Sequence, residues 1–260
     1  MKVLVKNTLI NFQTFGKGNA VVLLHGFLES SLMWKDIVPT LSKKYKVVTI
    51  DLLGHGKSEN HGYIHTMTDQ AEIVKAILNH LKLRKYVLIG HSMGGYVALA
   101  FGQLYSKNVK GILLLNSTAL PDTKEKKTNR DRAIKAVKEN YKSFVRIAVP
   151  MLFADKNKAI YKKKIQEGIQ DALRMNPQGI IASLEGMKIR KNLTKLYTTV
   201  NCPIHMVISK QDPALDYNSL ISQTKNTKVS ISELPDGHMS YIENKTDVIK
   251  IIADFLKNCY

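Results

Sequence analysis

The sequence has 260 residues, of which 44% are hydrophobic and 23% are charged. These ordinary values exclude intrinsic disorder, collagen-like repeats and a coiled coil, and a chain of this length buries enough surface to fold without disulfide staples. The formal net charge is +18, and because the excess is almost all lysine it indicates a solvated surface rather than a nucleic-acid partner.

Short apolar runs alternate with longer stretches of helical spacing along the first 120 residues. The alternation predicts βαβ crossovers and therefore a parallel sheet with helices on both faces. We expect strands at 3–5, 9–15, 20–24, 45–51, 86–89 and 109–115. We expect helices at 31–41, at 66–81 with Thr68 as N-cap, and at 94–105.

The pattern changes between residues 121 and 196, where lysine-rich helical stretches punctuated by prolines contain no convincing strand. Strands at 204–209 and 229–234 then resume the alternation, with helices at 217–223 and 247–256. The sequence therefore predicts an α/β fold: a mostly parallel, doubly wound, eight-stranded sheet with a helical cap. The predicted core domain is 1–120 and 196–260, and the cap, 121–195, is inserted between strands six and seven.

The segment with the clearest chemistry is Gly90-His91-Ser92-Met93-Gly94, which runs from a buried strand directly into a helix. A serine held clear at the end of a sheet needs a sharp turn, and only glycine fits two residues before and after it. We therefore predict that Ser92 is a nucleophile. The helix behind the turn directs its amide groups and dipole toward it.

Serine becomes an effective nucleophile when a base takes its proton and a third group orients that base. Two later loops, each following a strand, offer such groups. Asp212 follows the strand at 204–209 and is the predicted acid, with Asp216 as the alternative. His238 follows the strand at 229–234 and is the predicted general base.

Acyl transfer also needs hydrogen-bond donors for the oxyanion that develops in the transition state. The Met93 amide follows the nucleophile and is one predicted donor. The Phe27 amide, in the loop after the strand at 20–24, is the other, because Gly26 lets the backbone approach closely.

The remaining histidines are assigned no catalytic role. We expect His25 and His55 to form local hydrogen bonds, and His61 and His65 lack the helical pattern of a metal pair. Gly56-Lys57-Ser58 is not a phosphate-binding loop, since position 51 is aspartate where that motif needs glycine. No metal or cofactor is expected, and two cysteines are too few for a disulfide framework.

Together these motifs resemble the α/β-hydrolase fold superfamily over nearly the whole chain. The resemblance rests on His25-Gly26-Phe27, on the segment from Asp51 to Ser58, on the turn at Ser92, and on Asp212 and His238. It implies a Ser92–His238–Asp212 triad beneath a helical lid. At Leu28 and Glu29 the sequence differs from those families of the superfamily that carry proline just after the aromatic residue of this loop, here Phe27.

The function expected from these features is that of a serine hydrolase, similar to carboxylesterases, acting on a small ester or acyl compound. The alternatives are a carbon–carbon bond hydrolase or menaquinone-pathway-like lyase with the same triad, a non-catalytic ligand receptor, and a lysine-driven polyanion binder. Apolar lid residues could line an acyl pocket, and they are Met151, Leu152, Phe153, Leu173, Met175, Leu184 and Met187. No run is apolar enough to suggest a membrane span or signal peptide, so we expect a cytoplasmic protein.

Overall fold

The computed structural model describes all 260 residues and contains one eight-stranded sheet. The strands are β1 (Lys2–Val5), β2 (Thr8–Phe15), β3 (Ala20–Leu24), β4 (Lys46–Ile50), β5 (Tyr86–His91), β6 (Val109–Leu115), β7 (Ile204–Ser209) and β8 (Ser230–Leu234). Their order across the sheet is β1-β2-β4-β3-β5-β6-β7-β8. β1 and β2 pair antiparallel, as does β2 with β4, and all other pairs are parallel. The predicted fold class is confirmed.

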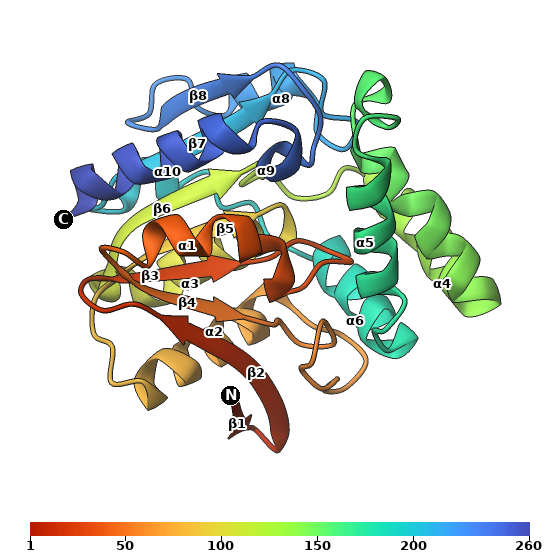
Figure 1. Ribbon diagram of the computed structural model, residues 1–260, viewed down its shortest axis with the longest axis horizontal. Coiled ribbons are helices and arrows are strands. Elements are labelled where there is room, and N and C mark those ends of the chain that lie inside the picture. The colour runs from red at the N-terminus through yellow and green to blue at the C-terminus, as the bar shows by residue number, and fades with distance from the viewer.

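Helices cover both faces of this sheet, with α1 and α10 on one face and α2 and α3 on the other (Figure 1). The helices are α1 (Val38–Leu41), α2 (Met67–His80), α3 (Met93–Tyr105), α4 (Lys124–Ala148), α5 (Lys162–Ala172), α6 (Pro177–Lys188), α7 (Leu196–Thr199), α8 (Tyr217–Ser222), α9 (Ser240–Glu243) and α10 (Lys245–Cys259). Four 3-10 turns complete the structure, namely η1 (Ser31–Asp36), η2 (Ser106–Asn108), η3 (Pro150–Leu152) and η4 (Asp155–Asn157). None of the α-helices is both long and apolar enough to cross a membrane.

The central strands are buried on both faces, which explains their unbroken apolar sequences. Every residue of β3 and of β5 is buried. Each fully buried Val, Leu or Ile side chain contributes about 1.5–3 kcal/mol to folding, so these strands form the stable centre of the molecule. In the parallel register Leu24 lies beside Gly90, and the loops that follow β3 and β5 therefore leave the sheet side by side.

The chain between β6 and β7 contains only helices, of which α4, α5 and α6 gather at one side of the sheet (Figure 1). The helix α4 is kinked at Asn140, whose φ of −157° and ψ of 91° are not helical. The side chain of Asn140 accepts a hydrogen bond from the Ser143 amide and so caps the second half of the helix. We call this helical segment, residues 121–195, the cap; that it is a cap inserted into the core domain between strands six and seven stays a prediction.

Two local predictions were wrong. The helix α2 is capped by Thr66 instead of Thr68: its hydroxyl accepts from the Asp69 amide while the Asp69 carboxylate accepts from the Thr66 amide. The expected helix at 31–41 is broken into η1 and α1. Pro39 falls in the first turn of α1, a position where the missing amide hydrogen is tolerated, so the helix restarts there.

Candidate active site

Ser92 lies at the turn between β5 and α3 in a strained backbone conformation, with φ of 48° and ψ of −114°. The glycines around it are required by close contacts. A Cβ at Gly90 would collide with the Gly94 carbonyl, and a Cβ at Gly94 would collide with the Leu24 carbonyl. The structure therefore holds the Ser92 side chain at the end of the sheet, as the sequence pattern predicts.

His238 and Asp212 meet in a buried pair. The Asp212 Oδ2 atom lies 2.8 Å from His238 Nδ1, and the two side chains are 0% and 3% exposed. The loops that carry them leave neighbouring strands and are joined by a hydrogen bond from the Lys210 amide to the Leu234 carbonyl. Asp216 does not reach His238, because its carboxylate caps α8 through the Ser219 amide.

Hydrogen bonds keep the Asp212 carboxylate ionised. Its Oδ1 atom accepts from the amides of Ala214 and Leu215, and its Oδ2 atom accepts from the Asn116 side chain as well as from His238. Burial opposes the charge, but the attraction of His238 and these hydrogen bonds outweigh it, so the pKa of Asp212 lies below its ordinary value. An ionised Asp212 requires the proton on His238 Nδ1, which leaves Nε2 free to act as a base.

Ser92 and His238 line the same cavity, whose volume is about 270 Å³. Its other walls include Phe27 and Tyr96 from the core and Leu152, Leu184 and Met187 from the cap helices. The Ser92 hydroxyl forms no hydrogen bond with a protein group. Catalytic hydrogen bonds of this kind often form only when substrate is bound, so the geometry is compatible with proton transfer to His238.

Of the two predicted oxyanion donors, Phe27 lines this cavity, and Met93 directly follows Ser92, which also lines it. The register of β3 and β5 brings the Phe27 loop against the turn at Ser92. The Phe27 amide donates to no protein acceptor, and the Met93 amide occupies the first position of α3, where amides have no partner within the helix.

A buried ion pair that the sequence did not reveal joins the three loops around the cavity. His91 Nδ1 lies 2.7 Å from Glu29 Oε2, and His91 Nε2 lies 3.0 Å from the His238 carbonyl oxygen. Because both partners are acceptors, both ring nitrogens carry protons and His91 is an imidazolium cation. Glu29 also accepts from the Gly26 amide at 2.6 Å and from the Tyr241 hydroxyl at 2.9 Å.

The pKa values of this pair agree with its geometry. Burial opposes charge on both groups, but their mutual attraction and hydrogen bonds outweigh it. The pKa of Glu29 is therefore lowered and the pKa of His91 is raised. The only signal in the sequence was the unusual glutamate at position 29, and nothing local pointed to His91 as its partner.

Asn116 is a second residue that the sequence did not indicate. It follows β6 with a φ of 46°, and its side-chain Nδ2 atom donates to Ser209 and to Asp212. Its side-chain oxygen accepts from the Ser240 hydroxyl. Asn116 therefore fixes the acid loop against the loop that carries His238.

The remaining sequence candidates are accounted for locally. His25 contacts the Gly26 carbonyl and accepts from the Leu52 amide, while burial lowers the pKa of His55 to about 3. His65 contacts the Ser183 hydroxyl. Of the seven lid residues, Leu152, Leu184 and Met187 line the cavity, whereas Met151, Phe153, Leu173 and Met175 do not.

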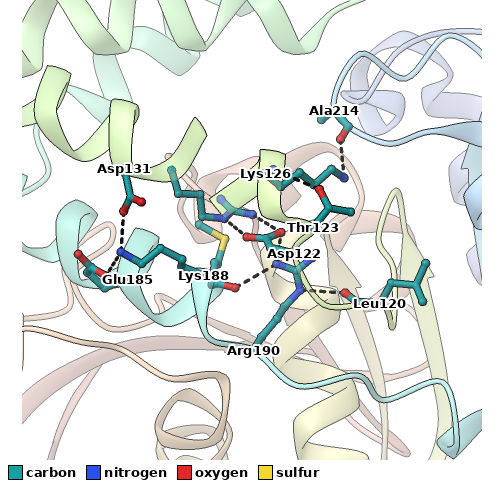
Figure 2. A network of polar contacts seen from close by, with 11 residues as sticks. Leu120, Asp122, Thr123, Lys126, Asp131, Glu185, Lys188, Arg190 and Ala214 are labelled. Carbon is teal, nitrogen blue, oxygen red and sulfur yellow. Dashed lines mark hydrogen bonds and ion pairs between the residues drawn. The ribbon is translucent and has the colours of Figure 1, made fainter. Parts of the chain in front are cut away.

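The cap joins the core through a cluster centred on the Asp122 carboxylate (Figure 2). Asp122 lies where the chain enters the cap and forms ion pairs with Arg130 of α4 and with Arg190, which follows α6. The Arg190 guanidinium also stacks 4.1 Å from the ring centre of Tyr96, a wall of the cavity. The entry and exit of the cap are thus held at one point beside the site.

A family described as the alpha/beta hydrolase fold matches residues 19–245 of the sequence. The chain belongs to this family. The match spans both loops that flank the cavity and the whole helical segment, and it confirms the resemblance seen in the motifs.

Solved structures with the same fold agree with this assignment. The malate-bound structure of a thermophilic esterase from Thermogutta terrifontis matches with a TM-score of 0.93 and 28% identity, over 100% of this chain and 98% of that one. The enol-lactonase from Burkholderia xenovorans LB400 matches with a TM-score of 0.92 and 21% identity, over 99% and 100% of the two chains, and shows the shared fold alone.

Two relatives from Bacillus subtilis (strain 168) differ in how much they align. The "Putative 2-succinyl-6-hydroxy-2,4-cyclohexadiene-1-carboxylate synthase" is 27% identical over 91% of this chain and 90% of its own length. The "Uncharacterized hydrolase YugF" is 36% identical, but the alignment covers only 38% of each protein.

Proposed function

We propose that this protein is a serine hydrolase that cleaves a carboxylic ester or a related acyl bond. The observation that carries the proposal is the buried pair of His238 and Asp212, whose histidine lines the same cavity as Ser92. The 28% identity to a thermophilic esterase over the whole chain supports the same class of reaction.

In the proposed mechanism, His238 Nε2 takes the proton of Ser92 as its oxygen attacks the carbonyl carbon. The Phe27 and Met93 amides stabilise the oxyanion. His238 then protonates the leaving group, and water cleaves the acyl-enzyme with His238 as base. Asp212 holds the imidazole tautomer and stabilises its cation during both steps.

A panel of p-nitrophenyl esters of increasing acyl length tests this function. We expect turnover by the wild type and a loss of about 10⁴-fold or more in kcat for Ser92→Ala and for His238→Gln. Ser106→Ala is the matched control, since Ser106 is exposed at the end of α3 and should leave turnover unchanged. Ester turnover that persists in Ser92→Ala would contradict the assignment.

The second candidate is a lyase or carbon–carbon hydrolase that uses the same triad. The alignment with the synthase-named relative over 91% of this chain favours it. This function predicts no turnover of any ester in the panel while Ser92 remains reactive toward a fluorophosphonate. A receptor would instead show melting temperatures that rise with ligand and no turnover.

A further inference from the structure

One wall of the catalytic cavity is cationic. The first turns of α4 contribute Lys126, Asn129 and Arg130 to the cavity that also contains Ser92 and His238. Lys126 and Arg130 are each only partly exposed, so their charges act within the cleft more than in bulk water.

Lys126 has no acidic partner. Its ammonium group makes one hydrogen bond, at 3.3 Å, to the carbonyl oxygen of Ala214, which also lines the cavity (Figure 2). An ammonium group has three donors. Two of them are therefore available to a ligand in the cavity.

Arg130 is only partly neutralised. Its Nε and Nη2 atoms contact Asp122, while Nη1 has no partner in the protein. The same carboxylate also pairs with Arg190, so one negative charge is shared by two guanidinium groups. The cluster formed by Lys126, Arg130, Arg190 and Asp122 therefore keeps an excess of positive charge.

No other lining residue cancels this excess. Glu29 is the one acidic residue that lines the cavity, and its charge is matched by the imidazolium of His91. Asp212 lies behind His238, where it accepts hydrogen bonds from the loop amides and from Asn116. A substrate in this cavity meets two cationic side chains with unused donors.

We propose that the substrate carries a free anionic group, which Lys126 and Arg130 bind while Ser92 attacks the scissile carbonyl. This inference rests on the proposed function and names its substrate class. Because a cavity of about 270 Å³ must hold the anion and the reacting group together, the substrate is short. A half-ester of a short dicarboxylic acid is the simplest example.

The test compares p-nitrophenyl hydrogen glutarate with p-nitrophenyl pentanoate, which replaces the carboxylate by a methyl group. The wild type should show the higher kcat/KM with the anionic ester. Lys126→Met should lower the ratio of the two kcat/KM values about tenfold, the effect expected for one lost hydrogen bond to a charged group. Lys127→Met is the control, because Lys127 lies on the same turn but is exposed and does not line the cavity.

A binding measurement separates failure of this inference from failure of the proposed function. Glutarate should bind the Ser92→Ala protein in calorimetry, and Lys126→Met in that background should weaken binding about tenfold. Binding that depends on Lys126 without ester turnover would support the anion site and contradict the esterase. Ester turnover with no preference for the charged ester, and an unchanged ratio in Lys126→Met, would overturn the anion site alone.

Arg130→Gln is the second variant, and it should lower the same ratio. Since Arg130 also pairs with Asp122, this change is expected to reduce stability, whereas Lys126 contacts only a carbonyl oxygen. Lys126→Met is therefore the decisive variant.

Discussion

At the scale of single residues, the ion pair of Glu29 and His91 connects the loops that surround Ser92. Glu29 holds the Gly26 amide next to the Phe27 amide, and His91 holds the carbonyl of His238. A displacement of either loop would move an oxyanion donor or the general base, and errors of about 1 Å in such positions cost about 10²-fold in rate.

We predict that Glu29→Gln destabilises the protein by about 3 kcal/mol, because it leaves a buried imidazolium without its counter-ion. Urea unfolding of Glu29→Gln, His91→Gln and the double variant measures the coupling, which should exceed about 1 kcal/mol. Tyr241→Phe is the matched control: it removes one hydrogen bond to the charged Glu29 but keeps the ion pair, and it should cost about 1.5 kcal/mol, less than Glu29→Gln. Additive effects of the two single changes would contradict this account.

The residues that the sequence predicted and those it missed differ in a physical way. Ser92 was predictable because its turn imposes a local pattern of glycines, and His238 and Asp212 because each lies in the loop that follows a strand of the sheet. Glu29 and Asn116 act through partners that lie 62 and 96 residues away in the chain. No local pattern reports such contacts, so only the folded structure shows them.

At the scale of elements, the cap divides the space above the nucleophile. A second cavity of about 510 Å³ lies between α5 and η1, and Phe27, Glu29 and Leu152 line both cavities. Polar contacts tie α5 to the core across this space, among them Ser30 with Asp171 at 2.5 Å and Lys35 with Glu167 at 2.7 Å. We therefore expect Leu152 to limit the length of the group that the cavity with Ser92 accepts.

Truncation of Leu152 should join the two cavities. We predict that Leu152→Ala raises the kcat/KM ratio of p-nitrophenyl octanoate over butyrate by about tenfold, the effect of burying about two further methylenes at about 0.8 kcal/mol each. Met151→Ala is the control, because Met151 precedes Leu152 in the chain but its side chain is 60% exposed and lines neither cavity. The same ratio in Leu152→Ala and wild type would show that Leu152 does not set the limit.

The starts, breaks and kinks of the helices were the features of the fold that the sequence predicted least well. Proline, glycine and apolar spacing placed all eight strands, yet the division of 31–41 into η1 and α1 and the kink at Asn140 depend on packing and capping. The N-cap of α2 was predicted two residues too late, at Thr68 instead of Thr66. The sequence holds both threonines close together, and only the backbone geometry distinguishes them.

At the scale of the whole molecule, the Asp122 cluster connects the two ends of the cap segment to the core. Burial opposes ionisation of Asp122, but the hydrogen bond and attraction of Arg130, together with those of Arg190, lower its pKa below the ordinary value. Its contribution to stability is therefore complete above the unfolded pKa near 3.8 and is lost as pH falls through the lower folded pKa.

We predict that Asp122→Asn lowers the free energy of unfolding by about 3–5 kcal/mol at pH 7, because two arginines are left without their shared counter-ion. The difference from wild type should shrink once the pH falls below the folded pKa of Asp122. Asp131→Asn serves as control, since the exposed pair of Asp131 with Lys188 should contribute less than about 1 kcal/mol. Urea titrations at pH 7 and in acid measure both variants, and a difference from wild type that grows in acid would contradict the lowered pKa of Asp122.

The central claim is that Ser92 is activated by the buried histidine and aspartate beneath the cap. The most direct measurement is intact-mass analysis after treatment with a fluorophosphonate, followed by peptide mapping of the adduct. We predict one adduct per chain, located on Ser92, which is absent in Ser92→Ala and formed far more slowly in His238→Gln. An adduct on another residue, or labelling of Ser92→Ala at the wild-type rate, would contradict the account.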